Sequence, residues 1–224
     1  MFFEEKRDII SSGIKMDRYG LIALSGGNLG LRTATGEILI TPSGIIYEEM
    51  KPDDILVMDI EGSIISGDKK PSSDTAAILY IFKHRPDLNA VIHTHQPYAT
   101  AVGLIQDELE VCLTTLANAT RGSVKVCPYS SAGSVDMGID TVNNLGDSLA
   151  VILAHHGVMT VGKDLNQALY AAVYLEEASK CYLSAKAVGT PKKMNSEQIS
   201  QAVEIFNYYG QGTDQIPEHL LKRV

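Results

Sequence analysis

The chain has 224 residues, of which 45% are hydrophobic and 21% charged, and its formal net charge is -8. This length and balance fit one globular domain with a substantial core. The acidic balance and the absence of a Lys/Arg run argue against nucleic acid as a partner. No apolar stretch approaches the ~20 residues that a membrane span needs, and the first ten residues hold no apolar signal segment. We therefore expect a cytoplasmic protein with no membrane partner.

The predicted elements, in chain order, are a helix over 4–19, strands at 38–40 and 55–60, a helix from about 73 to 84, a strand over 89–95, a short helix over 97–104, a helix over 134–145, a strand over 149–154, a long helix from 164 to about 188 and a last helix over 196–209. Apolar spacing separates the helices from the strands, and Gly, Pro or Asp bounds most segments. The stretch 110–127 is ambiguous between strand and turn. Segment 25–36 is rich in Gly, Ser and Thr.

No linker or internal repeat divides the chain, and helices and strands alternate around several runs that look antiparallel. We expect a single three-layer α/β domain over 1–209. Residues 210–224 are polar and Gly-rich, and we predict a mobile C-terminal tail there. The three cysteines, Cys112, Cys127 and Cys181, are widely spaced, so they form neither a disulfide framework nor a CxxC metal site. We interpret them as reduced thiols that mostly fill the core.

Two histidine motifs indicate a metal site. His93 and His95 lie on a predicted strand, where residues i and i+2 point to one face, about 6–7 Å apart. His155 and His156 follow directly after the buried strand 149–154, and Asp74 stands near the start of a helix. One isolated His is usually a hydrogen-bonded structural residue, but two such motifs at strand ends favour a shared cation. Three His and one carboxylate would suit Zn²⁺, with Mn²⁺ or Co²⁺ as alternatives.

Three further segments could bind a phosphate group. Ser25-Gly26-Gly27-Asn28 can expose backbone N–H groups, Thr41-Pro42-Ser43-Gly44 offers a hydroxyl on a tight turn, and Ser72-Ser73 lies at a predicted helix N-terminus. Each segment alone is more often an ordinary turn or cap. None of them is a P-loop or a dinucleotide-binding motif. Beside a metal set, the three together indicate a phosphorylated substrate.

At these residues the sequence resembles the class II aldolase/adducin family. The resemblance rests on SGGNLG, ITPSGIIYEEM, KPSSD, AVIHTH, CPY and AHHGV, which occur in order over nearly the whole chain. It implies a central, mainly antiparallel sheet flanked by helices, and a homotetramer with active sites between subunits. It also implies metal ligands at Asp74, His93, His95 and His156. The implied phosphate contacts are Ser25, Asn28, Ser43, Gly44, Ser72 and Ser73.

The resemblance also implies catalytic residues. Asp74 would be both ligand and proton carrier, and Tyr209, near the end of the chain, would act on the aldehyde oxygen. Two departures bear on this assignment. The aldolase pattern usually has Glu where this chain has Asp74, which is one methylene shorter, and a neighbour's Tyr in the aldolases would fall near Thr114 here. The PSSDT form around Asp74 is closer to the epimerase branch of the family, whereas AHHGV resembles the aldolases.

The leading hypothesis is a metal-dependent aldehyde-lyase. It would cleave a small ketose phosphate, similar to L-fuculose 1-phosphate, to dihydroxyacetone phosphate and a short aldehyde through a metal-stabilised enediolate. The alternative is a sugar phosphate epimerase similar to L-ribulose-5-phosphate 4-epimerase, which runs the same cleavage and re-adds the aldehyde. A sugar-acid phosphate decarboxylase or dehydratase ranks lower. A non-catalytic module similar to the adducin head ranks lowest, because it would not need the four predicted ligands.

Overall fold

The computed structural model of this chain describes residues 1–211 and 213–222. Its helices and strands are α1 (Phe3–Arg18), β1 (Asn28–Arg32), β2 (Ile38–Ile40), η1 (Pro52–Asp54), β3 (Leu56–Met58), β4 (Ile64–Ser66), α2 (Thr75–His84), β5 (Ala90–Thr94), α3 (Pro97–Gly103), β6 (Glu108–Leu109), α4 (Thr114–Thr120), β7 (Val124–Cys127), α5 (Asp136–Leu145), β8 (Ala150–Leu153), β9 (Gly157–Gly162), α6 (Leu165–Lys186), α7 (Ser196–Phe206) and η2 (Glu218–Leu221). In the described ranges no helix has both the length and the apolar character needed to cross a membrane.

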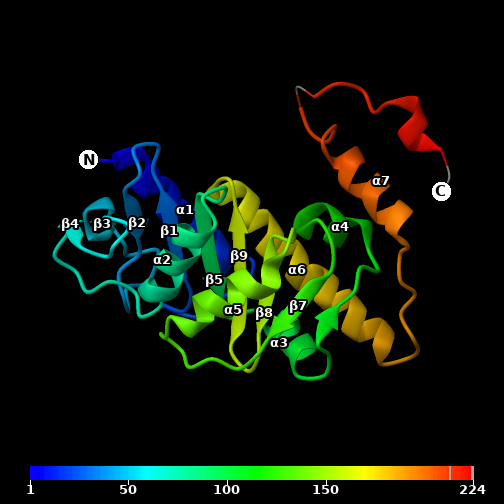
Figure 1. The fold of residues 1–224 in the computed structure, drawn as a ribbon, viewed down its shortest axis with the longest axis horizontal. Coiled ribbons are helices and arrows are strands. Elements are labelled where there is room, and N and C mark those ends of the chain that lie inside the picture. The colour runs from blue at the N-terminus through cyan, green and yellow to red at the C-terminus, as the bar shows by residue number, and fades with distance from the viewer. Residues whose placement is uncertain (212, 223–224) are drawn as a thin grey trace.

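The strands form one sheet in the order β4-β3-β2-β1-β5-β9-β8-β7-β6. Neighbouring strands are antiparallel except for β7 and β8, which are parallel. Figure 1 shows this sheet across the molecule with β5 and β9 near its middle. The prediction of a mainly antiparallel central sheet is confirmed.

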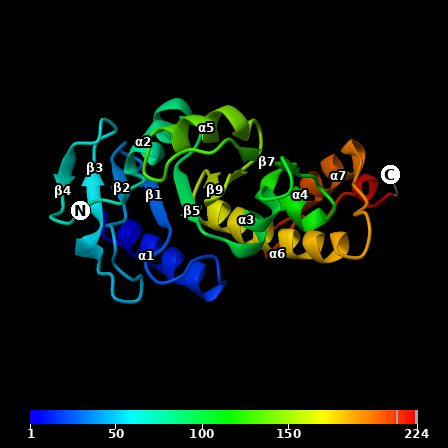
Figure 2. The same cartoon turned by 90° about the horizontal axis from the view of Figure 1, so that it is seen from below.

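Helices cover both faces of the sheet, so the domain has three layers. Figure 2 shows α2 and α5 on one face and α1, α3 and α6 on the other. The side chains of β5 alternate accordingly: Val91 packs in the core cluster under α2 and α5, while Ala90 and Ile92 pack with α1 and α6. The period of two therefore directs the next odd-numbered residue, His93, to the face that α2 covers.

Several elements escape the sequence pattern, among them β1, β4, β9 and helix α4. β1 lies inside the Gly-rich stretch, where Gly30 replaces an apolar side chain. A Cβ at Gly30 would lie 2.5 Å from Ile78 Cγ2, so glycine lets α2 approach the sheet closely. β4 is fully exposed, and β9 starts at Gly157 with no preceding turn signal. Part of the ambiguous stretch 110–127 is helix α4.

The segment around η2 packs against α7. Gln201 Nε2 donates to the carbonyl oxygens of Leu220 and Lys222, and Leu220 is buried. These contacts connect η2 to the last long helix. Residues 212, 223 and 224 of the predicted tail lie outside the described residues, and the mobility of the tail stays a prediction.

Candidate active site

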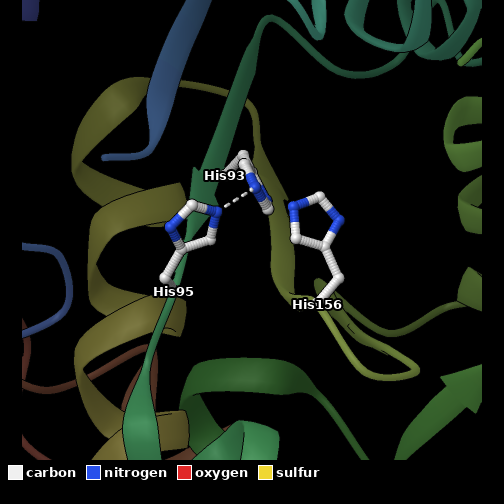
Figure 3. Close-up of side chains that lie close together, drawn as sticks. All are labelled: His93, His95 and His156. Atoms are coloured by element: carbon white, nitrogen blue, oxygen red, sulfur yellow. Dashed lines mark hydrogen bonds between the residues drawn. The ribbon is translucent and has the colours of Figure 1, made fainter. Parts of the chain in front are cut away.

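The imidazole rings of three histidines lie together at the end of β5, one of the central strands of the sheet. Figure 3 shows His93, His95 and His156 pointing toward one another. One ligand nitrogen from each lies within 4.8 Å of the others, and the Nε2 atoms of His93 and His95 are 3.0 Å apart. His93 is buried, His156 is half-buried and His95 is exposed, so the group lies at the boundary between core and solvent. The sequence placed the two motifs separately, and the fold joins them.

The sheet register explains why these residues meet. His93 pairs with Met159 of β9, and Thr94 pairs with Val158. The connection between β8 and β9 therefore reaches the end of β5, and His156 lies in that connection. His155 has a left-handed backbone (φ 58°), which a non-glycine residue adopts rarely and which tightens this turn.

Gly157 allows the imidazoles to pack against this turn. A Cβ at this position would lie 2.2 Å from the carbonyl oxygen of Thr94, 3.1 Å from His95 Cδ2 and 3.3 Å from His93 Cε1. No side chain fits there without moving β5 or the two rings. Close packing thus explains why the third residue of the HHG motif is glycine.

The hydrogen bonds set the chemistry of the cluster. His93 Nδ1 lies 2.9 Å from the carbonyl oxygen of Val158, so Nδ1 carries the proton and the lone pair of Nε2 faces the other rings. His156 Nδ1 is buried and has no partner among the described residues. Burial lowers the pKa of His93 to about 4, with further lowering by His95 and His156 against an opposing effect of Asp74. Burial also lowers the pKa of His95. Neutral, converging imidazoles are what a divalent transition metal requires.

Asp74 lies beside the three histidines. It precedes the first residue of α2, is 5% exposed, and its Oδ2 is 3.9 Å from His93 Nε2. Asn28 Nδ2 donates a hydrogen bond of 2.6 Å to the same Oδ2. Among the described residues, the group of ligand atoms within 4.8 Å of one another comprises the three histidines alone, and Asp74 lies beside it. These four residues fit a divalent cation with three nitrogen ligands and one oxygen ligand.

The three predicted phosphate segments are connected by hydrogen bonds. Leu29 N donates to Thr41 Oγ1 and Thr41 N donates to the Leu29 carbonyl, which joins the first segment to the second. Ser72 N donates to the Thr41 carbonyl, which joins the second segment to the third. Gly26 lies against His95, because a Cβ there would be 3.3 Å from His95 Nδ1. The fold therefore assembles all three segments next to the histidines.

The residues of these segments differ in accessibility. Ser25, Ser43, Gly44 and Ser73 are exposed, whereas Asn28 and Ser72 are buried. The Ser72 hydroxyl accepts from Asp74 N at 3.3 Å, and Asn28 donates to Asp74. In this structure Asn28 and Ser72 thus also hold Asp74, a role that the sequence analysis did not assign. The exposed members remain open to an anionic ligand.

Tyr209 does not join the histidine group in this chain. It follows α7, is 73% exposed, and stacks on Phe206 with ring centroids 5.6 Å apart. Figures 1 and 2 show α7 at the end of the molecule beyond α4, away from β5 and β9. A role of Tyr209 in catalysis would therefore require a second copy of the chain.

This fold and site correspond to a known family, and the chain belongs to it. The family described as Class II Aldolase and Adducin N-terminal domain matches residues 7–183. Among curated relatives, 5-deoxy-D-ribulose 1-phosphate aldolase of Bacillus thuringiensis is 31% identical over 93% of this chain and 98% of its own length. L-fuculose phosphate aldolase of Escherichia coli K12 is 32% identical over 91% of this chain and 94% of its own. The predicted family is confirmed.

Solved structures agree with the sequence relatives. A structure titled L-fuculose 1-phosphate aldolase superimposes with a TM-score of 0.85 at 31% identity, covering 90% of this chain and 95% of that chain. The predicted fold class is therefore confirmed, and the relatives are class II aldolases, that is, metal-dependent aldehyde-lyases.

Proposed function

We propose that this chain is a divalent-metal-dependent aldolase that cleaves a small ketose 1-phosphate to dihydroxyacetone phosphate and a short aldehyde. The observation that carries the proposal is the group of three converging histidines next to the Asp74 carboxylate. Membership of the class II aldolase family supports the same reaction class. We propose His93, His95, His156 and Asp74 as the metal ligands and Zn²⁺ as the metal, with Mn²⁺ or Co²⁺ as alternatives.

The reaction would break the bond between C3 and C4 of the ketose. A base removes the proton of the C4 hydroxyl, the C4 oxygen becomes the aldehyde oxygen, and the bonding electrons pass to the C2 carbonyl. A proton then returns to C3 to give dihydroxyacetone phosphate. When bound, the divalent ion would supply a Lewis acid for the C2 carbonyl and the adjacent hydroxyl.

Residues of the chain would supply binding and proton transfer. Ser25, Asn28, Ser43, Gly44, Ser72 and Ser73 would hold the phosphate, which aligns the C3–C4 bond at the histidine group. Asp74 would carry the proton to and from C3. Tyr209 of a neighbouring subunit would carry the proton of the C4 oxygen, because within its own chain it lies away from the histidines. This requires a second copy of the chain, and we propose a homotetramer with sites between subunits, together with a cytoplasmic location.

The relatives support a substrate class. Two of them are aldolases named for L-fuculose phosphate and 5-deoxy-D-ribulose 1-phosphate. Cleavage of L-fuculose 1-phosphate between C3 and C4 releases lactaldehyde, and cleavage of 5-deoxyribulose 1-phosphate releases acetaldehyde. Both leave dihydroxyacetone phosphate. We propose that this chain acts on a ketose 1-phosphate of this kind, with L-fuculose 1-phosphate as the first candidate.

The test is a panel of ketose 1- and 5-phosphates incubated with metal-loaded protein. A coupled reductase detects dihydroxyacetone phosphate, and NMR follows the sugar configuration in the same samples. We expect release from a ketose 1-phosphate that stops when a chelator removes the metal and returns when the metal is restored. Appearance of a second pentulose 5-phosphate without release would move the assignment to an epimerase. Turnover that persists in fully metal-free protein would overturn the proposal.

A further inference from the structure

Helix α6 holds the backbone on both sides of His95. α3 starts two residues after His95 and packs on α6, as Figure 2 shows. The N-terminus of α3 has no side-chain cap from its own segment. Its free N–H groups point instead to Glu176, which lies in the middle of the α6 sequence. Tyr98 N donates to Glu176 Oε1 and Ala99 N donates to Glu176 Oε2, both at 2.9 Å.

A second contact lies on the same segment. Gln96 is fully buried, its Oε1 accepts from the Thr94 hydroxyl at 2.8 Å, and its Nε2 donates to the Ala172 carbonyl of α6 at 2.6 Å. Thr94 and Gln96 are the immediate neighbours of His95. The backbone N–H of His95 itself donates to the Leu21 carbonyl at 3.1 Å. The backbone at His95 is therefore held by Leu21 and, through its neighbours, by α6, because β5 ends at Thr94.

Glu176 places a carboxylate in a buried position of α6. The side chain is only 6% exposed, and no Lys or Arg lies within salt-bridge distance among the described residues. Burial raises the pKa of Glu176, while the N–H groups of Tyr98 and Ala99 lower it. Keeping a carboxylate at such a place is unfavourable unless both of its oxygens have donors. A neutral amide could accept only one of the two bonds, and its NH₂ group would face the other N–H.

We propose that Glu176 is a positioning residue of the metal site, which acts through the Thr94–Ala99 segment to hold His95 in register with His93 and His156. It touches neither the metal nor the substrate. This inference rests on the proposed metal site. Outer residues that orient metal ligands typically change metal affinity 10- to 100-fold when they are replaced.

The experiment compares Glu176→Gln with two matched controls. Glu177→Gln removes the same charge from the exposed adjacent position of α6. Asn195→Ala removes the hydrogen bond that the Asn195 side chain accepts from Gln198 N at the start of α7, and so lowers stability away from the site. The affinity of each protein for Zn²⁺ is measured with a competing chelator. The visible spectrum of each Co²⁺-loaded protein reports the ligand geometry, and urea unfolding of the metal-free proteins reports stability.

We expect Glu176→Gln to weaken Zn²⁺ binding by about 10- to 100-fold and to change the Co²⁺ spectrum, with both controls matching the wild type in these two readouts. A loss of stability equal to that of Asn195→Ala, with wild-type Zn²⁺ affinity and spectrum, would overturn the proposal and leave Glu176 as a helix cap only. If Glu176→Gln does not fold, Gln96→Met tests the same segment, and unchanged Zn²⁺ affinity there would overturn it equally. A wild-type protein without Zn²⁺ affinity would instead overturn the proposed metal site.

Discussion

Asn28 Nδ2 donates a 2.6 Å hydrogen bond to Asp74 Oδ2 across 46 positions of the chain. Both side chains are buried, and Asn28 also pairs with His93 across β1 and β5. This relationship ties one of the proposed phosphate residues to the carboxylate that would complete the metal site. It also means that the Gly-rich segment and the start of α2 are held together before any ligand binds.

Replacement of Asn28 by Ala should therefore weaken metal binding. We expect Zn²⁺ affinity to fall about 10- to 100-fold, because Asp74 loses the donor that orients it. Equilibrium dialysis against a Zn²⁺ chelator measures this. Asn89→Ala is the control, since it removes an amide donor at the opposite end of β5. A higher KM for the sugar phosphate with unchanged Zn²⁺ affinity would show that Asn28 contacts only the phosphate.

His93→Ala and His95→Ala should each lose metal and activity together. Removal of one of the four proposed ligands leaves an incomplete coordination sphere, so we expect metal content near zero after dialysis and turnover reduced by at least about 10³-fold. Metal analysis and the coupled assay are run on the same preparations. His84→Ala is the control, because His84 stacks on Tyr80 at the exposed end of α2. A metal-replete, active His95 variant would exclude His95 as a ligand.

Acid should destabilise the metal-free protein. The folded state keeps His93 neutral with a pKa of about 4, whereas the unfolded chain has the ordinary value of 6.5. Between these values the unfolded state binds more protons, so the free energy of unfolding falls as the pH falls from 6.5 toward 4. Urea unfolding across that range measures the slope. The slope should be shallower in His93→Gln, and equal slopes in both proteins would contradict the assignment.

Gly157→Ala should disturb both the fold and the site. A Cβ at this position would lie 2.2 Å from the Thr94 carbonyl oxygen, so β5 or β9 must shift. We expect the free energy of unfolding to fall by about 1–3 kcal/mol and Zn²⁺ affinity to fall with it. Gly122→Ala is the control, because nothing lies within 4 Å of a Cβ there. Wild-type stability and affinity in Gly157→Ala would show that the close approach is relieved without effect on the rings.

Tyr209 should act in a neighbouring subunit. We expect Tyr209→Phe to lower turnover by about 10²- to 10⁴-fold with metal content unchanged, because it removes only a proton carrier. Mixed oligomers of Tyr209→Phe and His93→Ala should regain activity that neither variant has alone, since some sites would combine an intact metal set with an intact tyrosine. Coupled assays before and after subunit exchange measure this. Full activity of the Tyr209→Phe homo-oligomer would remove Tyr209 from the mechanism.

The sequence alone determined the parts whose signals are local. Apolar spacing identified α1, the Asp164 cap and a stretch without Gly or Pro identified α6, and a continuous apolar run identified the buried strand β8. The alternation of a strand placed His93 and His95 on one side. The glycine and hydroxyl motifs marked the segments around Ser25, Ser43 and Ser72. These patterns also carried the resemblance to the family to which the chain belongs.

Only the tertiary structure decided which residues meet. The register of β5 against β9 brings His156 to His93, and the contacts of Leu29, Thr41 and Ser72 join three distant loops. β1 and β9 could not be read from apolar pattern, because Gly30 and Gly157 are glycines for packing reasons that lie in α2 and β5. Likewise Glu176 reads in the sequence as one of two adjacent acids on a helix, and its burial depends on hydrogen bonds to Tyr98 and Ala99 of α3, far away in the chain. Sequence spacing fixes the direction of a side chain within its own element, whereas the partner it faces depends on how separate elements pack.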